Sequence, residues 1–364
     1  MHIYRGSVLG IVPDMTDINH QGPIYYFCAE KHAYTIGVFL EYYENPLKGA
    51  LRIIPYEQLG KLGQVTPGTF IFTDFERLSP GQLETVTALC ATIANQNPDL
   101  LLLNDPATTA GRFDLLKRLK AAGINRFDVH RVAERAGITR FPVFLRWASQ
   151  HVPPLSGLLA TADELEGALA RLPRQIRDDK DLIIVEFGAA PSGDGRYRKY
   201  SAFRVGDTIY AQHCFISSDW YVKFSNADLS DGDKAEHHDY VRQNPHAAEL
   251  RSIFELAGID YGRIDYGLVE GEIQTYEINT NPTVNSRPPR WNRDTNYALY
   301  ADLHSQAMLG LLGPAAGPPV KLGDGHRTVQ DVHAECLRRV RRRIRKLQLS
   351  RRVRALKQRL AWWR

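Results

Sequence analysis

The chain has 364 residues, of which 43% are hydrophobic and 24% are charged, and these values exclude a disordered, collagen-like or disulfide-stapled protein. A chain of this length is expected to form two or three folded units, each with its own core. No apolar run approaches the roughly 20 residues that cross a bilayer, and the segment Met1 to Asp14 lacks the pattern of a signal peptide. The four cysteines lie far apart in the sequence, which is typical of reduced thiols in a cytoplasmic protein.

The net charge of +5 is distributed unevenly along the chain. Between Arg338 and Arg364 the sequence has 13 Lys or Arg and no Asp or Glu. Because the whole chain has 46 basic and 41 acidic residues, the part before this segment is acidic. The C-terminal segment is therefore expected to have its own kind of partner.

The first hundred residues alternate apolar runs with helical patterns. Ser79 and Pro80 begin a predicted helix that continues to about Asn95, because serine caps helices and proline fits the first turn. Strands that alternate with helices predict a small, mostly parallel sheet. The predicted strands are Ile24–Cys28, Tyr34–Leu40, Leu51–Ile54, Thr69–Thr73 and Leu100–Leu103.

The middle of the chain predicts further helices and strands. A capping box at Thr161 begins one helix, and Gly206-Asp207 forms the turn of a hairpin. The polar segment Asp219–Asn244 is interpreted as a mobile loop. The predicted helices are Arg112–Ala122, Asp128–Ala136, Thr161–Leu172 and Pro245–Ala257. The predicted strands are Phe141–Arg146, Leu182–Phe187, Tyr197–Val205 and Thr208–Cys214.

The segment Tyr261 to Asn281 predicts a second hairpin, with its turn at Gly271. If Val269 pairs with Ile273 across a three-residue loop, the alternation of side chains separates polar from apolar residues almost completely. A shift by one residue would mix the two kinds. The predicted polar face holds Arg263, Asp265, Thr275, Glu277 and Asn279, and the apolar face holds Ile264, Tyr266, Leu268, Tyr276 and Ile278.

This register places Asp265 directly opposite Glu277, and two facing carboxylates repel each other. A divalent cation removes the conflict, because Mg²⁺ prefers oxygen ligands and the amide oxygen of Asn279 adds a third. The sequence therefore predicts a metal site at Asp265, Glu277 and Asn279. The alternative is a solvent-facing hairpin whose acids are bridged by Arg263.

The pattern Arg263-x-Asp265, followed by Glu277-x-Asn279-x-Asn-Pro, resembles the metal-binding end of the ATP-grasp superfamily. In that family the Asp, the Glu and the Asn hold two Mg²⁺ on the ATP phosphates, and the arginine contacts phosphate or the acyl phosphate. The resemblance therefore implies ATP and Mg²⁺ as cofactors and Arg263 as a catalytic residue.

The resemblance extends upstream to the nucleotide-binding residues. Where the family has a phosphate-binding lysine this chain has Arg146, and the segment 151–157 replaces the flexible glycine-rich loop but is poor in glycine. The strand that ends in Glu186 and Phe187 resembles the one that hydrogen-bonds adenine. Lys199, on the following strand, is a candidate for a compensating phosphate contact.

The resemblance also implies the domain organisation and an α/β (α+β) fold. The predicted limits are 1–110 for an αβ pre-domain, 111–312 for an ATP-grasp-like nucleotide- and metal-binding domain, 313–326 for a Pro/Gly linker and 327–364 for a basic amphipathic helical tail.

ATP-grasp ligases activate a carboxylate as an acyl phosphate, which an amine then attacks. The resemblance implies this activity, on small-molecule or peptide substrates. An inactive relative that binds a ligand or acts as a scaffold is a first alternative, motivated by Arg146, and phosphotransfer is a second. Arg287, Arg290 and Arg293 follow the metal motif and are candidates for bidentate contacts to an acidic substrate, or else belong to a basic surface loop.

Apolar residues of the tail recur at helical spacing and most of the others are arginine, which predicts a basic amphipathic helix. Three interpretations remain open. The tail lies on an anionic membrane surface, which would place the protein peripherally on the inner face of the membrane, or it binds RNA or another polyanion. In the third it docks on the acidic body of its own chain or of a second subunit, as in a homodimer.

Overall fold

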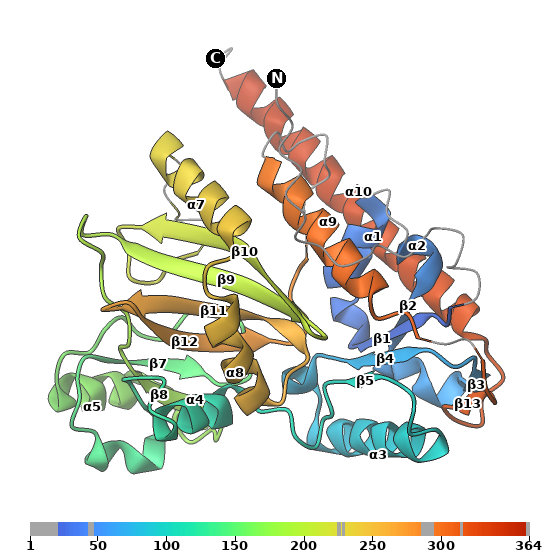
Figure 1. The fold of residues 1–364 in the computed structure, drawn as a ribbon. Coiled ribbons are helices and arrows are strands. Elements are labelled where there is room, and N and C mark those ends of the chain that lie inside the picture. Colours follow the sequence, from blue (N-terminus) through green and yellow to red (C-terminus); the bar gives the residue numbers. More distant parts are fainter. Residues whose placement is uncertain are drawn as a thin grey trace.

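The structure is a computed structural model that describes residues 21–42, 47–223, 227, 230–284, 295–313 and 316–361. Helices pack on several small sheets, one parallel and the others antiparallel, so the predicted α/β (α+β) class is confirmed (Figure 1). None of the helices described combines the length and the hydropathy of a membrane-spanning segment.

The N-terminal sheet is parallel and has the order β2-β1-β4-β5. Helix α3 (Pro80–Gln96) covers one face, where its Val86 packs near Phe27 of β1. The other side of the sheet carries helices α1 (Tyr34–Tyr42), α9 (Thr295–Leu309) and α10 (Val329–Ala361) (Figure 1). Burial on both faces explains why these strands read as continuous apolar runs. Four of the five predicted strands are confirmed, as β1 (Ile24–Cys28), β2 (Leu51–Pro55), β4 (Thr69–Phe72) and β5 (Leu102–Leu103).

The fifth predicted strand, Tyr34–Leu40, is wrong, because this segment forms helix α1 (Tyr34–Tyr42). The β-branched residues in it favour a strand locally, but packing against α10 decides the outcome. A Cβ atom on Gly37 would lie 2.8 Å from Cγ2 of Val340, so the glycine allows the two helices to approach closely.

The C-terminal segments return to this N-terminal sheet. Strand β13 (Val320–Lys321) pairs with β3 (Gln64–Val65), so the segment interpreted as a linker is fastened to the body. Helix α10 (Val329–Ala361) follows and packs on β2 and α1. The remaining helices on this side are α2 (Leu47–Ala50) and α9 (Thr295–Leu309).

The first half of α10 is docked on its own chain, as in the third interpretation of the tail. Cys336, Val340 and Ile344 are buried, and the Ile53 amide donates a 2.9 Å hydrogen bond to Nδ1 of His333. On the flanks of the helix, arginines pair with carboxylates of the body, for example Arg341 with Glu41 at 2.6 Å. Charge complementarity and apolar burial therefore both hold this half in place.

The centre of the molecule is an antiparallel sheet with the order β10-β9-β11-β12, and a smaller sheet with the order β6-β8-β7 faces it (Figure 1). The strands of the first are β9 (Tyr197–Val205), β10 (Thr208–Ser217), β11 (Tyr261–Val269) and β12 (Glu272–Asn279). Those of the second are β6 (Val129–Arg131), β7 (Val143–Trp147) and β8 (Leu182–Glu186). The accompanying helices are α4 (Arg112–Ala121), α5 (Ala162–Arg171), α6 (Arg174–Arg177), α7 (Asp231–Gln243) and α8 (Ala247–Ala257).

Two predictions in this region are wrong. The predicted helix Asp128–Ala136 is strand β6 followed by a short 3-10 helix, because the segment completes the sheet beside β8. Much of the predicted loop Asp219–Asn244 is helix α7, which contains the two adjacent histidines of this segment. Its start carries a capping box in which the Ser230 side chain accepts from the Asp233 amide, a signal that the sequence contained.

Candidate active site

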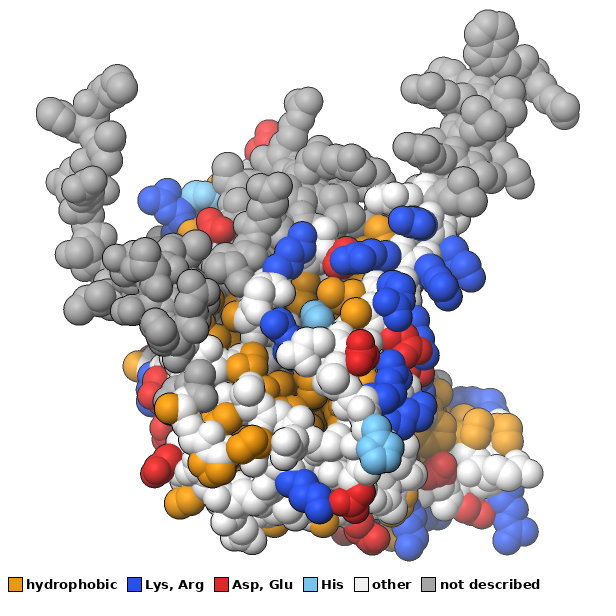
Figure 2. Space-filling view, turned by 90° about the vertical axis from the view of Figure 1, so that its right-hand side faces the viewer, with side chains coloured by type: hydrophobic (Ala, Val, Ile, Leu, Met, Phe, Trp, Pro, Cys, Tyr) orange, Lys and Arg blue, Asp and Glu red, His pale blue; other side chains and the backbone are white. Residues whose placement is uncertain are grey.

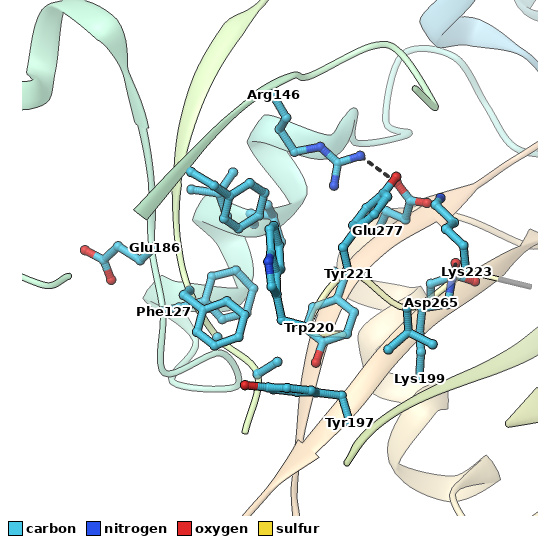
Figure 3. Close-up of a pocket in the computed structure, with 18 of the residues that line it drawn as sticks. Phe127, Arg146, Glu186, Tyr197, Lys199, Trp220, Tyr221, Lys223, Asp265 and Glu277 are labelled. Carbon is cyan, nitrogen blue, oxygen red and sulfur yellow. Dashed lines mark hydrogen bonds and ion pairs between the residues drawn. The ribbon is translucent and has the colours of Figure 1, made fainter. Parts of the chain in front are cut away.

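A cleft lies between the two facing sheets and encloses about 800 Å³, including its open mouth (Figure 3). Its two ends differ in chemistry. One end is aromatic and is lined by Phe127, Phe144, Phe187, Tyr197 and Trp220. The other end is charged and is lined by Arg146, Lys199, Asp265 and Glu277.

The β11–β12 hairpin supplies both carboxylates of the charged end. Asp265 pairs with Glu277, as predicted from the sequence, but the turn is shorter than predicted. It has two residues, Glu270 and Gly271, with φ of 54° and 83°, which is typical of the tight turns that suit twisted hairpins. A shift of register just beyond Asp265 compensates for the shorter turn, so Asp265 still faces Glu277 and Arg263 still faces Asn279, whereas Thr275 pairs with Tyr266.

Asp265 is 4% exposed and is surrounded by donors. Its Oδ1 accepts from Ser201 Oγ at 2.6 Å and from Arg263 Nε at 3.2 Å, and its Oδ2 accepts from Lys199 Nζ at 3.2 Å. Burial alone would raise the pKa of this carboxyl group, but the charges of Lys199 and Arg263 lower the pKa overall. Asp265 is therefore ionised at neutral pH.

Glu277 is held by a different set of cations. Arg112 donates to its Oε2, Arg146 Nη2 lies 3.3 Å from the same oxygen, and His151 Nδ1 lies 3.9 Å away. Burial opposes ionisation, but Arg112, His151 and Arg146 together hold the pKa of Glu277 well below its usual range. Each of the two facing carboxylates is thus neutralised by its own neighbours.

Arg112 is a central residue of this site that the sequence analysis missed. It lies at the start of α4, and its Nη1 donates to the carbonyl oxygens of Trp147, Ala148 and Gln150 at 2.6–3.1 Å. One guanidinium therefore ties Glu277 to the end of β7 and to the residues just before the segment 151–157. Its position directly after Gly111, at the start of a helix, is too common a pattern to identify it.

His151 connects the same carboxylate to the N-terminal sheet region. Its Nε2 lies 3.1 Å from Oε1 of Glu76, in the 3-10 helix Phe75–Arg77 that follows β4. Burial would lower the pKa of His151, but Glu277 and Glu76 raise it overall. The two acids therefore make protonation of this imidazole easier than that of a free histidine.

The charge balance of this end suits an anionic ligand. Four cationic side chains, those of Arg112, Arg146, Lys199 and Arg263, surround two carboxylates. The Arg146 Nε is buried and has no hydrogen-bond partner among the described residues, so this guanidinium has an unused donor at the wall of the cleft. Burial, followed by the charge of Arg112, lowers the pKa of Arg146 to about 10, which a phosphate beside it would reverse.

The donor set also fits a magnesium ion that arrives with a phosphate ligand. No group of three or more His, Cys, Asp or Glu in a metal-binding arrangement occurs among the described residues, so a cation here would have few protein ligands. Mg²⁺ commonly binds one or two carboxylates and completes its shell with water and substrate phosphates. Asp265 and Glu277 are the two carboxylates, and Asn279, whose Oδ1 accepts from the Asn281 amide at 2.8 Å, is the neighbouring amide.

The aromatic end contains Phe187, as expected for the strand beside a bound base. Trp220 lines the cleft and also packs against the hydrophobic core, with ring centroids 5.6 Å from Phe187 and 5.2 Å from Phe144. Glu186 differs from the expectation in its direction. Its carboxylate accepts from the Asp128 amide at 2.9 Å and points away from the cleft, so only its backbone is near the ligand space (Figure 3).

The other predicted residues divide into two groups. Arg146, Lys199 and Arg263 come together around the carboxylates, and their contacts with phosphate stay a prediction. Arg287, Arg290 and Arg293 lie outside the described residues, so their contact with an acidic substrate stays a prediction.

Comparisons with known proteins give similarity in structure only. No known family description matches the sequence, and no curated protein does. D-alanine–D-alanine ligase from Bacillus anthracis, in complex with ATP, has a TM-score of 0.47 at 14% identity over 80% of this chain and 95% of that chain. A RimK domain ATP-grasp protein from Sphaerobacter thermophilus has a TM-score of 0.47 at 13% identity over 80% of this chain and 100% of that chain.

The ATP-grasp ligase PsnB, bound to a precursor variant, Mg and ADP, has a TM-score of 0.45 at 12% identity over 79% of this chain and 97% of that chain. These are similarities to solved structures, and the ATP-grasp assignment stays a prediction from the hairpin motif. The substrates and activity of the chain depend on the side chains of the cleft.

Proposed function

We propose that the chain is an ATP- and Mg²⁺-dependent ligase that activates a carboxylate for attack by an amine. The observation that supports this most is the pair Asp265 and Glu277, facing each other at the cationic end of a cleft whose other end is aromatic. Facing buried acids are unfavourable by themselves. The two acids lie among four cationic side chains. This arrangement suits a site in which the acids exchange these partners for a metal–polyphosphate complex.

The residues would divide the work between the two ends of the cleft. The aromatic side chains of Phe187 and Trp220 would hold the base, and Arg146 and Lys199 would contact the phosphates. Asp265, Glu277 and Asn279 would hold Mg²⁺, which when bound supplies positive charge to the phosphates. Arg263, 3.2 Å from Asp265, would stabilise the negative charge of the transferred group.

Calorimetric titration with ATP, with and without MgCl₂, tests the nucleotide site. We expect Mg²⁺ to strengthen ATP binding at least about tenfold, because it cancels the repulsion between phosphate and carboxylate. ADP release that requires an added amine, measured with a panel of amino acids, would support the ligase. ATP binding that Mg²⁺ leaves unchanged would favour the inactive relative, and ADP release that needs only a phosphate acceptor would favour the phosphotransferase.

We also propose that α10 offers a basic surface to an anionic phospholipid membrane. Arg338, Arg342 and Arg345 recur at helical spacing on its exposed side, and none of them pairs with a described carboxylate. Figure 2 shows Lys and Arg side chains gathered on this side of the molecule. Leu347 of the same helix is 51% exposed, and an apolar residue beside arginines suits the interface of a bilayer.

Reversing these three charges, by Arg338→Glu, Arg342→Glu and Arg345→Glu, is expected to abolish sedimentation with phosphatidylglycerol-containing vesicles at low salt. Each basic residue near such a surface contributes about 1 kcal/mol, so the change is expected to exceed 100-fold in partition. The matched control reverses three exposed charges elsewhere, at Arg171, Lys180 and Arg242. Equal sedimentation of the two variants would contradict the proposal, as would binding to RNA but not to vesicles.

A further inference from the structure

A chain of buried hydrogen bonds lies behind Asp265, on the side away from Glu277. Ser201 Oγ donates to Asp265 Oδ1 at 2.6 Å, and Nε2 of His213 lies 2.8 Å from the same hydroxyl oxygen. Ser201 is fully buried and His213 is 9% exposed. Neither residue was singled out by the sequence, and neither touches the space where a ligand would lie.

The direction of these hydrogen bonds follows from the number of hydrogens. A serine hydroxyl has one hydrogen, and an ionised carboxylate only accepts, so Ser201 gives its hydrogen to Asp265. The contact with His213 must then be donated by the imidazole, which requires the Nε2–H form. Burial, followed by the charge of Arg263, holds the pKa of His213 well below its usual range, so the ring stays neutral.

The backbone places His213 opposite Ser201 by a local irregularity. Strands β9 and β10 pair regularly up to Ala211 and Ala202, after which the register shifts so that His213 faces Ser201. Bulges of this kind redirect side chains and are frequent beside active sites. The ring of His213 also stacks on Phe215, with centroids 3.9 Å apart, which fixes its orientation.

We infer that Ser201 and His213 are positioning residues that assign different tasks to the two oxygens of Asp265. Oδ1 is occupied by Ser201 and Arg263, whereas Oδ2 meets only Lys199 among the described residues. Oδ2 is therefore the oxygen presented to a divalent cation. When the metal ion replaces Lys199 at Oδ2, the Lys199 ammonium group can move to a phosphate. This inference rests on the proposed function, because it concerns the metal of that site.

Ser201→Ala tests the inference through metal binding rather than through activity. Residues that orient a metal ligand from behind typically change metal affinity 10- to 100-fold, and we expect a loss of this size for Mn²⁺ in the presence of ADP, measured by electron paramagnetic resonance. Binding of ADP without metal is expected to stay within about twofold of the original protein, because Ser201 does not line the cleft. Ser252→Ala, at an exposed serine of α8, is the matched control.

A pair of variants at His213 separates positioning from folding. His213→Gln keeps an N–H donor for Ser201 and is expected to retain Mn²⁺ affinity within about threefold, whereas His213→Leu removes the donor and is expected to lose about tenfold. Mn²⁺ affinity that is the same in Ser201→Ala, His213→Leu and the original protein would overturn the inference. Failure of the original protein itself to bind Mn²⁺ with ADP would instead overturn the proposed function.

Discussion

Glu277→Gln is expected to abolish the Mg²⁺ dependence of ATP binding and to destabilise the folded protein by about 3–5 kcal/mol, the usual cost of removing one partner from a buried ion pair. The amide would keep the shape of the side chain but would leave the guanidinium groups of Arg112 and Arg146 buried without a counter-charge. Urea unfolding measures the stability, and calorimetry with and without MgCl₂ measures the metal effect.

The same hairpin provides a matched control for this variant. Glu270 lies in the turn, its side chain is 76% exposed, and it pairs with Arg126 at the surface. Glu270→Gln is expected to change the free energy of unfolding by less than about 1 kcal/mol, because water screens exposed pairs. Equal stability of the two variants would show that Glu277 is not held as the structure indicates.

The sign of the pH dependence follows from the same contacts. The folded protein holds the pKa of Glu277 well below that of the unfolded chain, so the carboxylate stabilises the fold at neutral pH. This contribution is complete above the pKa of the unfolded chain and is lost as the pH falls toward the folded pKa. Asp265, whose pKa is also lowered, acts in the same direction, so acid should loosen the charged end of the cleft.

The core of the candidate site was predictable because it lies within one hairpin. Alternation of polar and apolar residues fixed the pairing of Asp265 with Glu277, even though the turn was predicted one residue too long. Only one register buries the apolar face of the hairpin, so the pattern outweighs an error in the loop. Local sequence is sufficient to predict a contact when both residues lie within the two strands that flank one turn.

Some of the residues that contact these acids were not predictable in the same way. Arg112, His151 and Ser201 lie on other segments, and nothing in their local sequence distinguishes them from surface or core residues. Tertiary packing also overruled local preference at Tyr34–Leu40, where contact with α10 favours a helix. The sequence predicted the chemical character of the site, whereas its charge balance depends on long-range contacts.

If the proposed function holds, the two carboxylates and their cations would exchange partners when a metal–nucleotide complex binds. In the state described here each acid is paired with protein cations, such as Arg146 with Glu277 and Lys199 with Asp265. With a metal–nucleotide complex the acids would turn to the metal, and the released cations would contact the phosphates. Exchange of partners in this way avoids leaving a buried charge unpaired in either state.

Arg112→Ala is expected to have the second large effect, a destabilisation of about 3–5 kcal/mol. The variant leaves Glu277 with one fewer buried partner and frees the carbonyl oxygens of Trp147 and Gln150. Arg112→Lys is expected to recover only part of the loss, because an ammonium group cannot donate as a fork to several acceptors. Arg118→Ala, on the same helix and exposed, is the control and should cost less than about 1 kcal/mol.

Combining Arg112→Ala with Glu277→Gln tests whether the two side chains act as one unit. Each single variant is expected to be destabilised mainly because its partner is left charged and buried. The double variant removes both charges, so its loss of unfolding free energy should be smaller than the sum of the two single losses. A coupling energy of about 1–3 kcal/mol is expected from the four unfolding measurements. Additive effects would mean that the loop contacts of Arg112, rather than its pairing with Glu277, account for its contribution.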